Sequence, residues 1–171
     1  MSVGLIGYRG SGKTTIGKRL ADRLWQPFID IDDLVIKKAG KSIKEIFEQE
    51  GEQRFRDLET EVVREVCTQP DTVIAFGGGA LDRDENREAI KQAGLRLIYF
   101  KCEPAELLKR IQNDPETAAN RPALSNLGGS IEEIESVLAR REPIWRSIAA
   151  AELEVTYLTP EDAVPYVVRL M

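Results

Sequence analysis

The chain has 171 residues, of which 24 are basic and 29 acidic, giving a net charge of −5. Hydrophobic residues make up 42% of the sequence, a share typical of a folded domain and too high for a disordered chain. The acidic balance argues against nucleic acid or an anionic membrane surface as partner, because either would require a basic excess. There is no histidine, which excludes Ser–His–Asp and Cys–His nucleophilic sites and His-ligated zinc.

The two cysteines, Cys67 and Cys102, lack the spacing of a metal site, so we expect two free thiols in a reducing compartment. No apolar run approaches the roughly 20 residues that a membrane span needs. The N-terminus lacks the basic region and long apolar stretch of a signal peptide. We therefore expect a cytoplasmic protein with no membrane partner, and, because no large apolar surface is evident, a monomer.

Short apolar runs typical of buried strands alternate with segments of helical period along the whole chain. Strands are predicted at residues 3–6, 28–32, 72–76, 95–100 and 153–157. Helices are predicted at residues 16–24, 34–39, 43–47, 51–66, 83–93, 104–111, 131–151 and from 160 to the end. Strands that are apolar on both faces predict a five-stranded parallel sheet covered by helices on both faces, an α/β fold.

No internal repeat or linker divides residues 1–171, so we expect a single domain. Residues 112–129 differ from the rest because they are rich in Asn, Asp, Pro, Ser and Gly and have almost no apolar periodicity. Polar loops of this length within a compact domain are often lids over a binding site. We therefore predict a mobile lid there, with a disordered insertion as the alternative.

Residues 7–14, G-Y-R-G-S-G-K-T, match the phosphate-binding pattern G-x-x-x-x-G-K-[ST] between a predicted strand and a predicted helix. Glycines let several backbone N–H groups point at one phosphate, and the helix N-terminus adds its partial positive charge. Lys13 is expected to reach the β- and γ-phosphates, and the Thr14 hydroxyl to bind Mg²⁺. The predicted ATP-binding residues of this P-loop NTPase fold are Gly10, Ser11, Gly12, Lys13, Thr14 and Thr15.

Two further acids are placed where a nucleotide site needs them. Many P-loop proteins carry a magnesium-binding Asp after a later hydrophobic strand. Here that strand, at 72–76, ends in three glycines and no acid, so the candidates for this role are Asp30 and Asp32 at the end of the second strand. Strand alternation puts both on one side, and ligands of open parallel sheets bind beyond the carboxyl ends of the strands. The alternative is helix N-capping, which we favour for Asp33.

Two arginines also suggest a binding role. Arg141 shares one helical face with apolar residues, so its charge needs an anionic partner unless the side chain extends to solvent. Arg140 turns to a different face and is expected to be solvated. Arg56 precedes Glu59 by three residues, a spacing that allows an ion pair on a helix surface or a steered binding arginine.

The order and spacing of these motifs resemble the shikimate kinase family along nearly the whole chain. The matching segments are the loop at 7–17, F-I-D-I-D at 28–32, G-E-x-x-F-R-x-x-E at 51–59, G-G-G at 77–79, R-P at 121–122 and R-R-E-P at 140–143. The resemblance implies Mg²⁺-dependent transfer of the γ-phosphoryl group of ATP to the 3-hydroxyl of shikimate, on the route to chorismate and aromatic amino acids.

The resemblance also implies a role for each matching residue. Asp30 would reach Mg²⁺, and Asp32 would hold the shikimate hydroxyls and take the proton from the attacking one. Arg56 and Arg141 would clamp the carboxylate, since the planar guanidinium fork matches that shape. The remaining substrate and nucleotide contacts would come from Gly77, Gly78 and Gly79 as a backbone wall, from Arg121 on the lid and from Arg110 beside the adenine.

The predicted catalytic residues are thus Lys13, Asp32 and Arg121. One alternative is another P-loop kinase of a hydroxylated acid such as gluconate. The set formed by Asp32, Arg56, residues 77–79 and Arg141 favours shikimate, because it fits a rigid cyclic carboxylate with vicinal hydroxyls. A second is a nucleotide-dependent binding module without catalysis, against which the presence of the catalytic residues argues. Arg9 occupies a variable position of the phosphate loop and is assigned no role.

Overall fold

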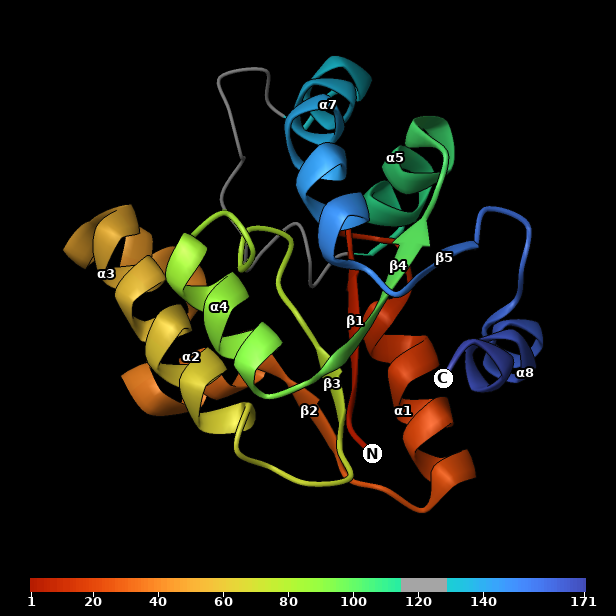
Figure 1. Cartoon of the computed structure of the whole chain (residues 1–171). Helices are drawn as coiled ribbons and strands as arrows, with labels where there is room; N and C mark the ends of the chain where they lie inside the picture. Colours follow the sequence, from red (N-terminus) through yellow and green to blue (C-terminus); the bar gives the residue numbers. More distant parts are fainter. Residues whose placement is uncertain (115–128) are drawn as a thin grey trace.

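The computed structural model describes residues 1–114 and 129–171. Five parallel strands form one sheet, as predicted, and their order across the sheet is β2-β3-β1-β4-β5 (Figure 1). The strands are β1 Val3–Gly7, β2 Phe28–Asp30, β3 Val73–Ala75, β4 Arg96–Lys101 and β5 Ala151–Glu154. No helix in the described part of the chain is long and apolar enough to cross a membrane.

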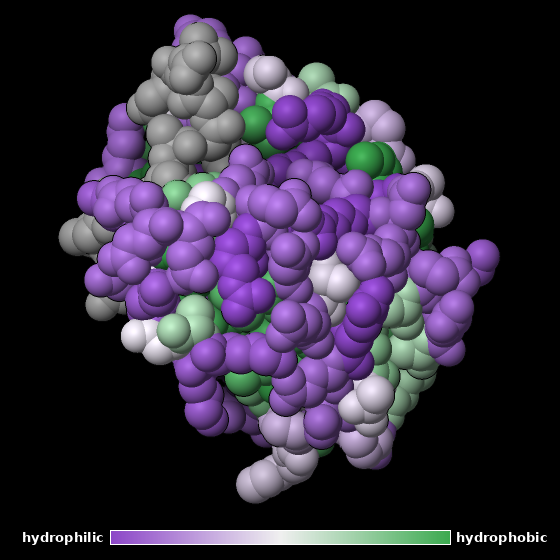
Figure 2. All heavy atoms as spheres, turned by 90° about the vertical axis from the view of Figure 1, so that its left-hand side faces the viewer, coloured by the Kyte–Doolittle hydropathy of each residue, from purple (hydrophilic) through white to green (hydrophobic). Residues whose placement is uncertain are grey.

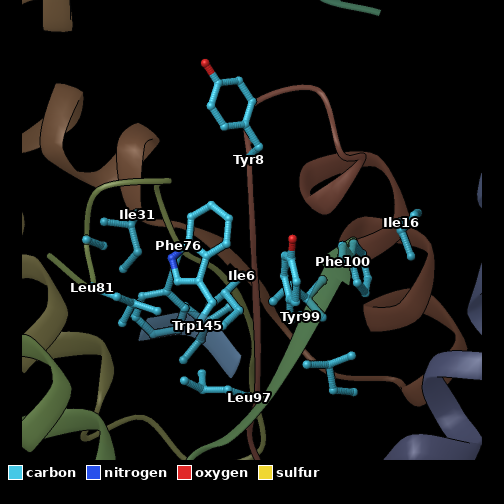
Figure 3. Close-up of a cluster of buried hydrophobic side chains, with 14 of the residues drawn as sticks. Ile6, Tyr8, Ile16, Ile31, Phe76, Leu81, Leu97, Tyr99, Phe100 and Trp145 are labelled. Atoms are coloured by element: carbon cyan, nitrogen blue, oxygen red, sulfur yellow. The ribbon is translucent and has the colours of Figure 1, made fainter. Parts of the chain in front are cut away.

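Helices cover both faces of the sheet. They are α1 Lys13–Leu24, α2 Ile31–Ala39, α3 Ile43–Val66, α4 Asp84–Gln92, α5 Pro104–Gln112, α7 Ile131–Ile148 and α8 Pro160–Leu170. Side chains alternate along β4, so that Tyr99 packs on Trp145 of α7, with ring centroids 5.3 Å apart, while Phe100 lies toward Ile16 of α1 (Figure 3). The helices α1 and α8 therefore cover one face, and α7 with its neighbour α4 the other.

The core lies on both sides of the central strands. Trp145, Tyr99, Phe76 and Phe100 are all almost completely buried, and burial of each such side chain contributes about 1.5–3 kcal/mol. Tyr8 is set apart from this cluster, beyond the end of β1, with its hydroxyl pointing away from it (Figure 3). The surface over α2, α3 and α4 is mostly hydrophilic, with only small separated apolar areas (Figure 2).

The second strand is shorter than predicted. Strand β2 ends at Asp30, whose carboxylate accepts a hydrogen bond from the backbone N–H of Asp32 at 3.0 Å and so caps α2. Asp32 therefore lies in the first turn of α2, and the prediction that it follows Asp30 along the same side of a strand is wrong. The prediction that Asp33 is the N-cap is wrong for the same reason.

Two other boundaries differ from the prediction. The helices expected at 43–47 and 51–66 form one kinked helix, α3, with Gly51 at φ 86° marking the kink. Helix α7 ends at Ile148, because Ala149 is already extended and leads into β5. Strand β5 begins at Ala151, opposite Ile98 of β4, two residues earlier than expected.

The register of the sheet decides what meets at its carboxyl edge. Leu5 of β1 pairs with Ala75 of β3, and Ala75 pairs in turn with Asp30 of β2. The segments that follow these three strands therefore lie beside one another at this edge. They are the phosphate loop, the β3–α4 loop with its glycines, and α2.

Candidate active site

The phosphate loop has the backbone shape that its glycines predict. Gly10 and Gly12 lie in the left-handed region, at φ 84° and 91°, where residues with a Cβ are strained. Gly12 is also the N-cap of α1 and offers no side-chain acceptor, so the first-turn N–H groups are available to an anion. The Lys13 ammonium donates to the carbonyls of Gly7 and Tyr8, at 2.8 and 2.9 Å, which holds it across the loop.

Thr14 and Asp30 are in contact although they lie on different elements. The Thr14 hydroxyl donates to Asp30 Oδ2 at 2.7 Å, while Asp30 Oδ1 caps α2. Hard oxygen donors of this kind suit Mg²⁺, which is usually held by one or two carboxylates together with substrate phosphates. Among the described residues there is no group of three or more Asp, Glu, Cys or His side chains that could hold a metal ion.

A hollow opens in front of the phosphate loop. It is lined by Arg9, Gly10, Gly12, Lys13, Thr14, Thr15, Ile16, Asp30, Asp32, Phe76, Gly77, Arg110, Ile111, Asp114, Leu158 and Pro160. Of the predicted nucleotide residues that the structure describes, all share this surface except Ser11, which is completely buried.

Arg110 crosses from α5 to this hollow and is held along its edges. Its Nε donates to Glu106 at 2.9 Å, and its terminal nitrogens to the carbonyls of Gly10, Val155 and Thr156 at 3.1–3.4 Å. With the edges occupied in this way, the flat face of the guanidinium is the part suited to stack on a planar ligand.

A second hollow adjoins the first. It is lined by Tyr8, Arg9, Asp32, Ile43, Phe47, Phe55, Arg56, Glu59, Gly77, Gly78, Gly79 and Arg141. The predicted acid-binding residues all meet here, although they come from α2, α3, the β3–α4 loop and α7. Phe47 and Phe55 pack on each other at 5.0 Å and form an apolar side of the hollow.

Arg56 lies against the glycines of the β3–α4 loop. A Cβ on Gly79 would come within 2.5 and 2.7 Å of the two terminal nitrogens of Arg56, closer than real contacts allow. A Cβ on Gly77 would come within 2.9 Å of an Asp32 oxygen and 3.1 Å of a Glu59 oxygen. A side chain at Gly77 or Gly79 would therefore displace charged groups that pack directly onto this backbone.

Glu59 is the buried partner of Arg56. Its carboxylate accepts from Arg56 Nη1 at 2.8 Å, and the Glu59 side chain is only 1% exposed. Burial raises the pKa of Glu59 to about 7; Arg56 opposes this shift, while the nearby charges of Asp32 and Asp82 add to it. The spacing of three residues thus forms a buried pair at the pocket, and not a pair on the helix surface.

Arg141 is buried and paired with a residue that the sequence did not indicate. Its side chain is 5% exposed, so the alternative in which it extends to solvent is wrong. Nε lies 3.1 Å from both carboxylate oxygens of Asp82, and Nη2 lies 2.7 Å from Oδ2. Its neighbour Arg140 is exposed, as predicted.

Three residues, Arg9, Asp32 and Gly77, line both hollows. A group bound in one hollow can therefore meet a group bound in the other beside Asp32. Arg9, to which the sequence assigned no role, is half-buried at this junction.

In and behind the second hollow, the residues missed from the sequence are Tyr8, Arg9, Ile43, Phe47, Phe55 and Asp82. Their only signals were proximity to a motif and, for the aromatic pair, a helical spacing that core packing explains equally well. Arg121 lies outside the described residues, as does most of the predicted lid at 112–129, of which residues 112–114 and 129 are described.

Comparison with known proteins adds an independent line of information. The family model described as shikimate kinase matches residues 9–171. A shikimate kinase from Rhodopirellula baltica is 38% identical over 165 residues, which cover 96% of this chain and 87% of that protein.

Solved structures agree with the sequence relatives. The chain superposes with a TM-score of 0.91 on the shikimate kinase from Acinetobacter baumannii in complex with shikimate, at 32% identity, covering 99% of this chain and 91% of the other. A gluconokinase from Sinorhizobium meliloti reaches a TM-score of 0.61 at 15% identity over 99% of this chain and 92% of the other, a likeness of fold alone.

Proposed function

This chain belongs to the shikimate kinase family and is an ATP-dependent kinase of shikimate; from that premise we propose which of its residues carry out the reaction. The second hollow, which is lined by Gly77, Gly78 and Gly79 of the β3–α4 loop, binds shikimate and is called the substrate hollow. The hollow in front of the phosphate loop binds ATP and is called the nucleotide hollow. The observation that carries this assignment is the position of Asp32, which lines both hollows at their junction.

Shikimate is a small anion, and the substrate hollow is built for one. We assign the grip on its carboxylate to Arg56 and Arg141, whose planar guanidinium groups match a carboxylate in shape and charge. Each arginine already has a carboxylate partner, Glu59 or Asp82, which offsets its charge and orients it within a buried setting. The bare backbone of Gly77, Gly78 and Gly79 lets the ring approach.

Asp32 is placed to act on the 3-hydroxyl of shikimate. Its carboxylate accepts the hydroxyl proton as the alcohol oxygen attacks the γ-phosphorus. The new O–P bond forms while the bond from the γ-phosphorus to the bridging β–γ oxygen breaks, and ADP departs with those electrons. Because phosphoryl transfer depends mainly on positioning and charge, a base fixed in the first turn of a helix is well suited to this task.

On the nucleotide side the backbone does most of the binding. The N–H groups of residues 10–15 hold the phosphates, and Lys13 lies across the same loop to reach the β- and γ-oxygens. The flat face of Arg110 stacks on the adenine, and Arg9 adds a positive charge at the junction where the phosphoryl group moves.

The kinases of this family use a divalent metal, and we propose Mg²⁺ held by Thr14 and Asp30. Their hydroxyl and carboxylate oxygens lie 2.7 Å apart beside the phosphate loop, a donor set that fits a hard cation. When bound, Mg²⁺ supplies charge neutralisation at the β- and γ-phosphates.

Two further assignments concern the lid and the oligomeric state. For Arg121 the support is the motif, and we propose that it presents a cation to the transferring phosphate from the lid. We also propose that the enzyme acts as a monomer, because the face of the molecule in Figure 2 shows only small separated apolar areas.

A substrate panel tests the assignment. With ATP and Mg²⁺ present, coupled ADP release is measured with shikimate, with quinate and with gluconate. We expect turnover with shikimate and little or none with gluconate, which lacks the rigid ring that the glycine wall and the two arginines fit. Equal turnover with gluconate would contradict the assignment of the substrate hollow.

A further inference from the structure

The pair formed by Asp82 and Arg141 joins the β3–α4 loop to α7 across 59 residues of sequence. Asp82 takes the Nε–Nη2 edge of the guanidinium in a forked contact, with distances of 3.1, 3.1 and 2.7 Å. The arginine side chain is 5% exposed and the aspartate 34%. Contacts with two parallel N–H groups fix the plane of a guanidinium as well as its position.

The opposite edge of Arg141 faces the substrate hollow. Its Nη1 lies 3.5 Å from the position that a Cβ would take on Gly78, which lines the same hollow. Among the described residues no hydrogen-bond acceptor for Nη1 is found, and Asp82 is not part of the described lining. The aspartate therefore sits behind the arginine, outside the space where a ligand binds.

We propose that Asp82 is a positioning residue for substrate binding: it holds the Nε–Nη2 edge of Arg141, so that Nη1 is presented to the carboxylate of shikimate. This inference rests on the role proposed above for Arg141. It adds a residue that lies outside every motif on which the family resemblance depends.

The loop that carries Asp82 is itself held in place. The backbone N–H of Asp82 donates to the carbonyl of Gly79 at 3.0 Å, and that of Ala80 donates to the carbonyl of Gly77 at 3.1 Å, which forms two successive turns. From α4, the buried Asn86 side chain donates to the carbonyl of Ala80 at 2.8 Å. One short segment thus sets both the glycine wall and the orientation of the arginine opposite it.

The charge of Asp82 also reaches the second arginine of the clamp. Burial lowers the pKa of Arg56, but the charges of Glu59, Glu52 and Asp82 outweigh burial and raise it. Competition between Asp82 and the substrate for Arg141 is the opposite possibility. If Asp82 competes with the substrate, its removal should lower the KM for shikimate. If Asp82 positions Arg141, its removal should raise that KM.

Steady-state kinetics of Asp82→Ala and Asp82→Asn separate these cases. We expect the KM for shikimate to rise roughly tenfold in Asp82→Ala, with a smaller rise in Asp82→Asn, which keeps one acceptor oxygen. The KM for ATP and kcat should change less than about threefold, because neither the nucleotide hollow nor Asp32 is touched. Glu88→Gln, which removes one exposed charge from α4, is the matched control and should leave all constants unchanged.

A KM for shikimate that stays within twofold in Asp82→Ala, or that falls, would overturn the inference. The double variant Asp82→Ala with Arg141→Ala distinguishes failure of this inference from failure of the proposed function. If Asp82 acts through Arg141, its removal has no further effect on the KM for shikimate once the arginine is absent. If Arg141→Ala alone leaves that KM unchanged, the clamp assignment itself is wrong.

Thermal unfolding of each variant accompanies the kinetics. Should Asp82→Ala fail to fold, Asp82→Asn supplies the decisive measurement. An unchanged KM in that folded variant would count against the positioning role, since loss of the charge alone must weaken the forked contact.

Discussion

The two halves of the active site are built in opposite ways. The phosphate loop occupies residues 7–14 without interruption, and its binding groups are mostly backbone N–H groups set by local geometry. The substrate hollow draws its side chains from α2, α3, the β3–α4 loop and α7, which are brought together only by the fold. A change in the loop should therefore act on the nucleotide, and a change in the hollow on the acid.

The two halves also handle charge differently. In the loop the positive potential comes from a helix N-terminus and from Arg9 and Lys13, which both line the hollow. In the substrate hollow the two arginines of the clamp are largely buried, and each has its own carboxylate, Arg56 with Glu59 and Arg141 with Asp82. A buried charge without a partner is very costly, so a clamp for an organic acid requires acidic residues behind it.

The largest expected effect lies at the junction of the halves. Asp32→Asn keeps the size of the side chain, and its backbone N–H can still donate to Asp30. The substitution removes the proposed base, so kcat should fall by about 10²–10⁴. Both KM values should stay within a few-fold. The exposed neighbour Asp33→Asn serves as control in the same ADP-release assay. Near-normal turnover of Asp32→Asn would remove Asp32 from the chemistry.

Lys13→Ala tests the nucleotide half by itself. Loss of the ammonium that lies across the loop should lower kcat by roughly 10²–10³ and weaken ATP binding, because charge on the phosphates is no longer offset. The KM for shikimate should change less than about threefold. Lys18→Ala, an exposed lysine on the same helix, should behave as wild type.

Arg141→Ala tests the acid half. Removal of a buried charged partner should raise the KM for shikimate by about 30-fold or more, with ATP affinity within a few-fold of wild type. The adjacent exposed Arg140→Ala should leave both constants unchanged. Equal losses of shikimate and ATP affinity would mean that the two halves are not separable at this residue.

Gly79→Ala is a milder probe of the same half. Its φ lies outside the left-handed region, so the main consequence is a new methyl group within 2.5 Å of Arg56 Nη1. The guanidinium must then shift, and the KM for shikimate should rise about tenfold. An unchanged KM, measured alongside an unchanged KM for ATP, would show that Arg56 does not need this glycine.

The smallest expected effect concerns stability and pH. Because the pKa of Glu59 is about 7 in the folded protein and ordinarily 4.5, the folded state binds more protons than the unfolded state between those values. The free energy of unfolding should therefore fall as pH rises from 4.5 to 7, by roughly 1–3 kcal/mol from this group.

Urea denaturation at several pH values measures this dependence, and Glu59→Gln should flatten it. The chain contains no histidine, so no such residue adds its own titration in the same window. An equal slope in wild type and Glu59→Gln would mean that Glu59 titrates normally.

Much of the architecture was predictable because it depends on local pattern. The alternation of apolar strands with helical segments indicated the five-stranded parallel sheet, and the glycine spacing of residues 7–14 indicated the phosphate loop. The exact end of β2 was not predictable in this way. An aspartate such as Asp30 can end a strand or cap a helix, and the sequence pattern does not distinguish the two. In the structure Asp30 does both, with one carboxylate oxygen at the cap of α2 and the other accepting from the Thr14 hydroxyl.

The sequence by itself thus determined the fold class, the nucleotide loop and the need of Arg141 for an anionic partner. Only the tertiary structure decided that this partner is Asp82, that Glu59 is buried with a raised pKa, and that Arg9 reaches the junction of the two hollows. The physical reason is the separation in sequence over which each property is determined. Backbone conformation and amphipathic period are properties of neighbours in sequence, whereas burial and ion pairing depend on which distant segments the sheet brings to its carboxyl edge.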